Sequence, residues 1–223
     1  MRRVDGRGVS MIELLVGTAL GLLVAAAAGS VLGTQHVAAR QLQNEARLMQ
    51  DLRATAELVA RDLRRAGHWA SAASGVRGDD AVVLANPYAA IAPAAAASDA
   101  VALSFSSDGS AGASVAANER FGFRLRGGAV EIQLGERNWQ ALNDPQTLVV
   151  TSFRVEPRID EASLAAFCAL PCAGASTTCP PRQQVRSFVI ALAGRSPADA
   201  QVTRALSSTV RARNDVVVGA CEG

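Results

Sequence analysis

The chain has 223 residues, 49% of them hydrophobic, which suffices for one ordinary domain plus an appendage. The formal net charge is only +2, and the basic residues are all Arg and spread along the chain. This pattern argues against a nucleic-acid-binding protein, which would gather its basic residues into a patch or stripe.

A short basic leader precedes a long apolar run. Three of the first eight residues are Arg, and no charged residue occurs from Leu14 to Ala39. The run is long enough to cross a bilayer as a helix. By the positive-inside rule, the N-terminus stays in the cytoplasm and the chain beyond the run is exported. The alternative is an ordinary secretory signal peptide, cleaved among the small residues at 25–29.

One acidic residue, Glu13, lies at the start of this apolar run and needs an explanation. The stretch G-V-S-M-I-E, from Gly8 to Glu13, resembles the type III signal of type IV pilins and pseudopilins. In that family a prepilin peptidase on the cytoplasmic side cuts after the Gly and methylates the new N-terminus, and the fifth mature residue is Glu. The resemblance implies cleavage between Gly8 and Val9, N-methylation of Val9, and a role for Glu13 in filament assembly. The family usually has Phe where this chain has Val9.

The apolar run passes into an amphipathic pattern that predicts one helix from Ser10 to Ala66. Gly67 follows as the left-handed residue that ends it. The expected organisation is a leader at 1–8, a transmembrane and filament-core helix at 9–35, its amphipathic continuation at 36–67, and an exported β-rich head at 68–223. The predicted buried stripe has helical spacing and consists of Met49, Leu52, Ala56, Val59, Leu63 and Ala66.

Beyond residue 80 the periodicity changes to two, which indicates strands. Because they follow one long helix without βαβ alternation, the expected fold class is α+β, with the helix packed on an antiparallel sheet. The clearest signal is a hairpin over 120–134 that turns at Gly127 and Gly128. The other expected strands are 80–86, 99–107, 147–158, 185–195 and 203–214.

The chain has four cysteines, all in its last third. In an exported domain they are expected to form disulfides, and the sequence leaves all three pairings open. We expect one bond to join the fourth cysteine, in the tail, to one of the three in the preceding loop. Their spacing lacks the paired C-x2-C knuckles of zinc sites, so no metal is expected. The four are Cys168, Cys172, Cys179 and Cys221.

Two further segments narrow the resemblance. The segment RDLRRAGHWA, Arg61 to Ala70, resembles the helix end of the PilW family of minor pilins. The final strand fits the R-x-x-x-x-T-V-x-x-R-N pattern of that family at Arg204, Thr209, Val210, Arg213 and Asn214.

Membership of that family implies a type IV pilin fold and a minor pilin that primes pilus assembly and lies near the tip. Its implied partners are the prepilin peptidase, other minor pilins, the major pilin and the assembly platform of the inner membrane. The implied location is the inner membrane, with the C-terminal domain in the periplasm, and the pilus.

The sequence offers no catalytic constellation, so no enzyme and no cofactor are expected. The acidic pairs Asp79–Asp80 and Asp160–Glu161 are interpreted as solvated turns, with calcium ligation as the alternative. Two other functions remain open: a J-type pseudopilin of a type II secretion system, and a periplasmic binding domain that keeps a signal anchor.

Overall fold

The N-terminal part of the chain forms one long helix. The structure, a computed structural model, describes residues 8, 10–75, 84–107, 114–173 and 178–222. Helix α1 runs from Met11 to Arg65, close to the predicted span. Gly67 has a φ of 76°, as predicted for the residue that ends the helix.

The chain divides into two compact units, Met1–Asn44 and Glu45–Gly223. The expected limits of the leader, the apolar helix and the head stay predictions, because the boundary between these two units does not test them.

The part of α1 that belongs to the second unit packs along the predicted stripe. Met49, the first stripe residue, is only half-buried, and its neighbour Leu48 is buried instead. Adjacent residues point about 100° apart on a helix, so the sheets that cover the helix decide which of two neighbours is buried. The stripe residues that are buried as predicted are Leu52, Ala56, Val59, Leu63 and Ala66.

The hairpin over 120–134 is confirmed. Strands β2 (Arg120–Arg126) and β3 (Ala129–Leu134) pair antiparallel, and Gly127 and Gly128 between them have φ values of 59° and 78°. Two positive φ values characterise the type I′ turn that two-residue hairpins favour. β1 (Ala100–Ser104) and β4 (Trp139–Ala141) complete a sheet with the order β1-β2-β3-β4.

The second sheet contains the longest strands. β5 (Val149–Ser163), β6 (Arg182–Arg195) and β7 (Thr203–Arg211) pair antiparallel in the order β5-β6-β7. The short strand β8 (Val216–Val218) pairs with β6 at 182–184, whereas β7 pairs with 187–195. The chain therefore leaves the sheet between β7 and β8, at 212–215. Arg213 and Asn214 of this segment contact the end of α1.

The α+β class with antiparallel strands is confirmed, but the strands form two sheets where one was expected. A period of two identifies strands without saying which of them pair. The chain crosses between the sheets at the buried Asn143, whose side chain accepts a hydrogen bond from the Val130 N–H (2.8 Å) and donates one to the Leu148 carbonyl (2.8 Å). β4 and β8 were not predicted.

Of the strand expected at 80–86, residues 80–83 lie outside the described residues and 84–86 form no strand. The described parts of the connections contain three short 3-10 helices: η1 (Ala72–Gly75), η2 (Ala117–Glu119) and η3 (Ala165–Phe167).

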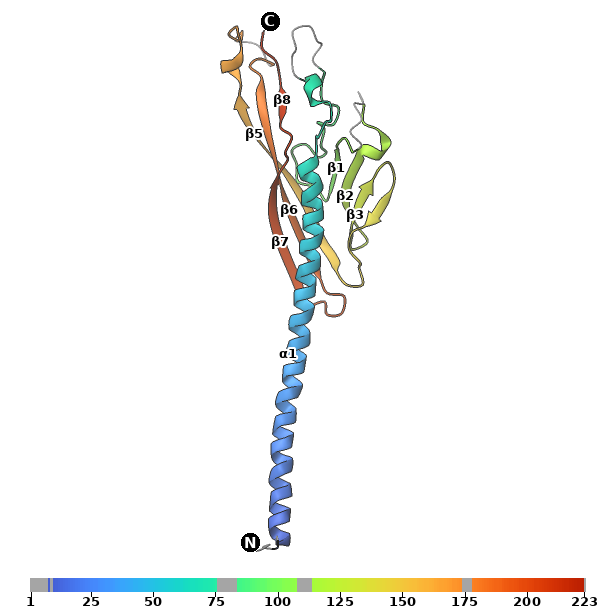
Figure 1. Cartoon of the computed structure of the whole chain (residues 1–223), viewed down its shortest axis with the longest axis vertical. Helices are drawn as coiled ribbons and strands as arrows, with labels where there is room; N and C mark the ends of the chain where they lie inside the picture. Colours follow the sequence, from blue (N-terminus) through green and yellow to red (C-terminus); the bar gives the residue numbers. More distant parts are fainter. Residues whose placement is uncertain (1–7, 9, 76–83, 108–113, 174–177, 223) are drawn as a thin grey trace, which may run out of the picture. The chain divides into compact units, whose positions relative to one another are not determined.

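One hydrophobic core joins the helix stripe to both sheets. The first sheet contributes Phe123 and Val130, and the second contributes Phe188 and Ile190, each of them buried. Figure 1 shows the last turns of α1 beside the strands of this unit. The helix stripe therefore holds the two sheets in one unit.

Replacing Leu52 by Ala tests this core. Leu52 is fully buried, so Leu52→Ala should lower the free energy of unfolding by about 2–5 kcal/mol. Its exposed neighbour is the control, because Arg53→Ala should change that free energy by less than about 0.5 kcal/mol. Urea unfolding in detergent micelles, followed by tryptophan fluorescence, measures both, since both tryptophans, Trp69 and Trp139, lie in the second unit. Equal losses would contradict the assigned packing.

Candidate functional site

The predicted cleavage junction lies just before the first turn of α1. Gly8 and Ser10 are exposed and outside the helix, and Val9 lies outside the described residues. The first helical bond runs from the Leu14 N–H to the Ser10 carbonyl (3.0 Å). A side chain at Gly8 would meet no atom within 4 Å. The described part of the chain therefore imposes no requirement for Gly at this position.

Glu13 lies in the first turn of α1 and is exposed. Among the described residues it has no ion-pair partner. A carboxylate in the first turn interacts favourably with the positive end of the helix dipole, by about 0.3–1 kcal/mol on an exposed surface. This gain does not exceed the cost of placing a lone acid at the edge of a bilayer core, about 1–3 kcal/mol. The intrachain interaction thus explains Glu13 only in part.

The helix that follows Glu13 presents bare apolar surface. Residues Met11–Ser30 have a mean hydropathy of 2.1, and none of this span is buried. Leu14 and Leu22, for example, are 61% and 72% exposed. By length and composition this segment can cross a bilayer, and a signal sequence near the N-terminus would meet the same criterion. So much exposed apolar side chain requires lipid or other protein to cover it.

The other end of α1 is held by residues from the tail. The last carbonyl groups of a helix have no partner within it. Here the Arg213 N–H donates to the Arg64 carbonyl (3.0 Å), and the Asn214 side-chain amide donates to the carbonyls of Ala66 (3.1 Å) and Arg65 (3.4 Å). We call this set of bonds, together with Arg186 below, the helix-end clamp.

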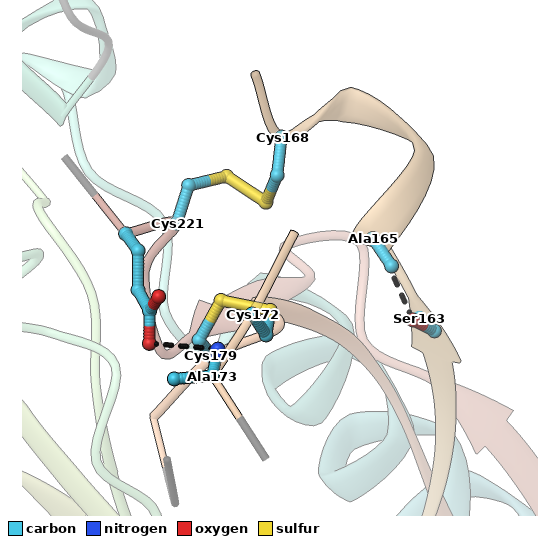
Figure 2. The surroundings of a disulfide bond; sticks show 8 residues. Ser163, Ala165, Cys168, Cys172, Ala173, Cys179 and Cys221 are labelled. Carbon is cyan, nitrogen blue, oxygen red and sulfur yellow. Dashed lines mark hydrogen bonds between the residues drawn. A yellow bond between two sulfur atoms is a disulfide. The ribbon is translucent and has the colours of Figure 1, made fainter. Parts of the chain in front are cut away.

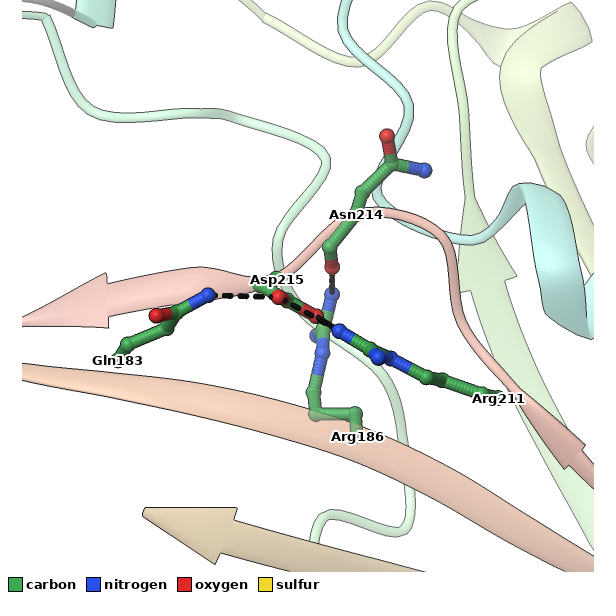
Figure 3. A network of polar contacts seen from close by, with 5 residues as sticks. All are labelled: Gln183, Arg186, Arg211, Asn214 and Asp215. Atoms are coloured by element: carbon green, nitrogen blue, oxygen red, sulfur yellow. Dashed lines mark hydrogen bonds and ion pairs between the residues drawn. The ribbon is translucent and has the colours of Figure 1, made fainter. Parts of the chain in front are cut away.

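Arg186 on β6 completes the clamp (Figure 3). Its side chain is buried, and its guanidinium donates to the backbone carbonyls of Asn214 (3.0 Å) and Ala89. Burial lowers the pKa of the Arg186 guanidinium below its usual value, because water solvates the cation better, and the negative charge of Asp215 partly opposes this shift. A Cβ at Gly67 would lie 2.8 Å from Arg186 Nη2, so the buried cation lies against the negative end of α1.

Asp215 is itself fixed from two sides. It accepts hydrogen bonds from Arg211 (3.0 and 3.2 Å) and from the Gln183 amide (2.7 Å), as Figure 3 shows. These bonds hold the Asp215 carboxylate near Arg186, without a direct hydrogen bond between the two in the described contacts. The buried cation is balanced by backbone carbonyls and by this neighbouring carboxylate.

The clamp gives a structural role to the two segments that resemble the PilW family, because it joins them. The helix end at Ala66–Gly67 and the final Arg213–Asn214 pair are far apart in sequence and touch in the structure. Arg186 was not singled out, although a signal existed. It falls in the same alternation as the buried Phe188 and Ile190 of β6, which places a cation on the inward face of a strand.

The cysteines form two disulfides (Figure 2). Cys221 bonds to Cys168 across 53 residues, which confirms the prediction that the tail is tied to the preceding loop, and Cys172 bonds to Cys179 across seven. Hydrogen bonds reinforce the tail, from the Ala220 N–H to the Thr178 carbonyl (2.9 Å) and from the Ala173 N–H to the Glu222 carboxylate (3.0 Å). The Cys168–Cys221 bond thus ties the tail to the loop between β5 and β6, and the Cys172–Cys179 bond closes a short turn within that loop.

No metal-binding group of three His, Cys, Asp or Glu side chains occurs in the part of the chain that the structure describes. Glu161, considered as a calcium ligand, pairs with Arg182 (3.2 Å) across the β5–β6 ladder. Asp79 and Asp80 lie outside the described residues. Asp160 and Glu161 both lie within β5 and are exposed, so the interpretation of this pair as a turn was wrong.

Removing the clamp amide tests its contribution. Asn214→Ala leaves two helix-end carbonyls without their side-chain donor and should lower the free energy of unfolding by about 1–2 kcal/mol. Asn138→Ala changes an exposed Asn in the β3–β4 turn and should have an effect within about 0.5 kcal/mol. Chemical denaturation of the two variants in micelles gives the comparison, and similar stability of both would exclude an energetic role for the clamp amide.

The two disulfides should differ in their contribution to stability. The chain-entropy argument assigns about 4 kcal/mol to closing the 53-residue separation of Cys168–Cys221 and about 2 kcal/mol to the seven-residue separation of Cys172–Cys179. Replacing each pair by Ala and comparing the unfolding midpoints tests this order. A larger loss from the short loop would show that native contacts, and not chain entropy, set the difference.

One protein-family model matches the chain. The family described as prepilin peptidase-dependent protein B matches residues 41–212. No curated protein and no solved structure matches the chain. The matched region contains the second part of α1 and the strands β1 to β7, and it leaves out the junction from Gly8 to Glu13. Because it covers more than half of the 223 residues, the chain belongs to the prepilin peptidase-dependent protein B family.

Proposed function

We propose that this protein is a minor pilin of the PilW type, which primes assembly of a type IV pilus and is incorporated near its tip. One observation carries the proposal: Glu13, five residues after Gly8, lies in the first turn of an apolar helix that has no buried residue over Met11–Ser30. The family match supports it independently, because residues 41–212 do not include this junction.

In this proposal the leader is removed first. The peptidase cuts the Gly8–Val9 bond at the cytoplasmic face of the inner membrane and methylates the amine of Val9. The non-helical, exposed backbone at Gly8 supports access to this bond, since a peptidase needs an extended and unhindered substrate. The arginines of the leader keep the junction on the cytoplasmic side.

The apolar helix then exchanges lipid for neighbouring helices. Inside a filament Glu13 would meet the positive amine of a neighbouring subunit, and the two charges attract more strongly there than in water. Each charge alone is unfavourable in apolar surroundings, so the pair specifies register as well as affinity. Partner minor pilins, the major pilin and the assembly platform would supply these contacts.

The head would contribute the specific part of the subunit. The clamp ties the tail to the helix end and the Cys168–Cys221 disulfide ties it to the preceding loop, which supports a head that moves as one body with residues 45–65 of the helix. The proposal assigns the protein no catalytic role and no cofactor. Its location would be the inner membrane, with the head in the periplasm, and the pilus.

Charge removal at Glu13 tests the proposal. Glu13→Ala should leave leader cleavage and membrane insertion intact but reduce recovery of this subunit in sheared pili, because an incoming subunit loses its partner for the neighbouring amine. Mass spectrometry of the N-terminus and immunoblots of membrane and pilus fractions measure these two effects separately.

Two variants serve as controls. Gly8→Glu should retain the leader, which shows what a processing defect looks like, and Glu136→Ala removes an exposed acid of the head and should be incorporated normally. Cleavage at another site would overturn the pilin assignment. Normal incorporation of Glu13→Ala would leave that assignment standing and exclude the charge pairing.

A further inference from the structure

The outer edge of β7 is open. β7 pairs with β6 alone among the described strands. At one end the Ala212 N–H donates to the Arg186 carbonyl, and at the other the Ser196 N–H donates to the Val202 carbonyl. Backbone N–H and C=O groups alternate in direction along a strand, so those of every second residue from 202 to 212 point toward β6. The N–H and C=O groups of Ala205, Ser207 and Thr209 therefore point away from the sheet, without a described protein partner.

This edge lacks the usual protection of a sheet edge. Between Arg204 and Arg211 the strand reads ALSSTV, with no charge and no proline. The strand at the other side of the sheet differs, because β5 carries Pro157 and several charged side chains, Glu156 and Arg158 among them. Proteins place charges and proline on free edges to prevent pairing with other chains. The sheet is thus protected on β5 and open on β7.

A groove runs along this edge beside α1. It has a volume of about 480 Å³ and is lined by residues 205–209 of β7 and by Met49, Arg53, Ala56 and Arg64, among others, of α1. A second hollow, also lined by Arg64 and Thr209, extends it along residues 209–213. We call the two together the edge groove. Figure 1 shows β7 and this part of α1 next to each other.

Apolar and basic side chains both line the edge groove. Met49, Ala56 and Leu206 contribute apolar surface. Arg53, Arg64 and Arg213 have no ion-pair partner among the described residues, whereas Arg211 pairs with Asp215 and Arg204 with Glu45. One acid, Glu57, also lines the groove. The uncompensated charge is therefore positive.

We propose that the edge groove binds an extended, acidic segment of a partner protein, which adds a strand to β7. The outward N–H and C=O groups supply the ladder hydrogen bonds, and five residues of β7 span about 17 Å, enough for a short strand. The arginines select carboxylates on the segment. The proposal rests on the second compact unit alone and does not depend on the pilin function.

The charges favour this occupant over a second copy of the chain. β7 contains no acidic residue, so two copies pairing through this strand would bring their basic grooves together. Like charges that meet at an interface oppose association. A helical partner would leave the outward backbone groups without ladder hydrogen bonds.

The test uses the full chain in detergent micelles and a fluorescein-labelled peptide, TVEVDVT, blocked at both ends. Fluorescence anisotropy should detect its binding, and the basic peptide TVKVKVT should bind at least about tenfold more weakly. Ser207→Pro removes an outward N–H and should abolish binding, whereas Ser207→Val keeps that N–H and should retain it. Arg53→Glu should weaken binding about tenfold, and Arg158→Glu on β5 should not.

Amide hydrogen exchange gives a second measurement that does not require a variant to fold. In the wild-type chain the amides of Ala205, Ser207 and Thr209 should exchange rapidly, and the TVEVDVT peptide should slow their exchange. Failure of the acidic peptide to bind at millimolar concentration, equal binding of the basic peptide, or full binding to Ser207→Pro would each overturn the proposal. Self-association lost in Ser207→Pro would instead identify a second copy as the occupant and overturn it too.

Discussion

Besides the shared hydrophobic core, the carbonyl groups at the C-terminal end of α1 bind the tail to the helix. These groups have no partners within the helix, and Arg213 and Asn214 of the tail donate hydrogen bonds to them. The Asn214 amide and the Arg65 carbonyl that it contacts are 149 residues apart in sequence. The helix end is therefore completed only when the second sheet has formed and β7 has left it at the right place. Helix, sheet and tail depend on one another through this small set of bonds.

Arg186 shows how such a junction can hold a buried charge. An isolated cation in a protein interior is costly because it loses its water. Here two backbone carbonyls accept its hydrogen bonds, and Asp215 lies near enough to offset part of the effect of burial on its pKa. Asp215 is oriented by Arg211 and Gln183. The charge is thus balanced by several partial interactions, and each of them also fixes a piece of backbone around the helix end.

Among the described residues, the first part of α1 and the edge groove are both uncovered, and they differ in chemistry. The first part of α1 is uniformly apolar, so lipid or other apolar helices can cover it without directional bonds. The edge groove offers a row of exposed backbone donors and acceptors together with arginines, which a strand can pair with in place of water. The first surface suits apolar contacts without directional bonds, and the second suits a contact that supplies matching hydrogen bonds and opposite charge.

The sequence by itself determined the elements that depend on near neighbours. The helix stripe from Leu52 to Ala66 follows from contacts three and four residues apart, and the β2–β3 hairpin follows from two glycines that tolerate positive φ. The junction at Gly8 to Glu13 is also a local pattern of six consecutive residues, and its role as a cleavage and assembly signal stays a prediction.

Only the tertiary structure decided the division into two sheets, the cysteine pairing, the helix-end clamp and the open edge of β7. Each of these joins residues that are distant in the chain, and a local pattern carries no information on which distant segment will satisfy a given polar group or cover a given strand. Arg186 lies between the two cases. The alternation in β6 placed it on the inward face, but the carbonyls that make its burial possible come from the segments around Ala89 and Asn214, which only the folded chain brings to it.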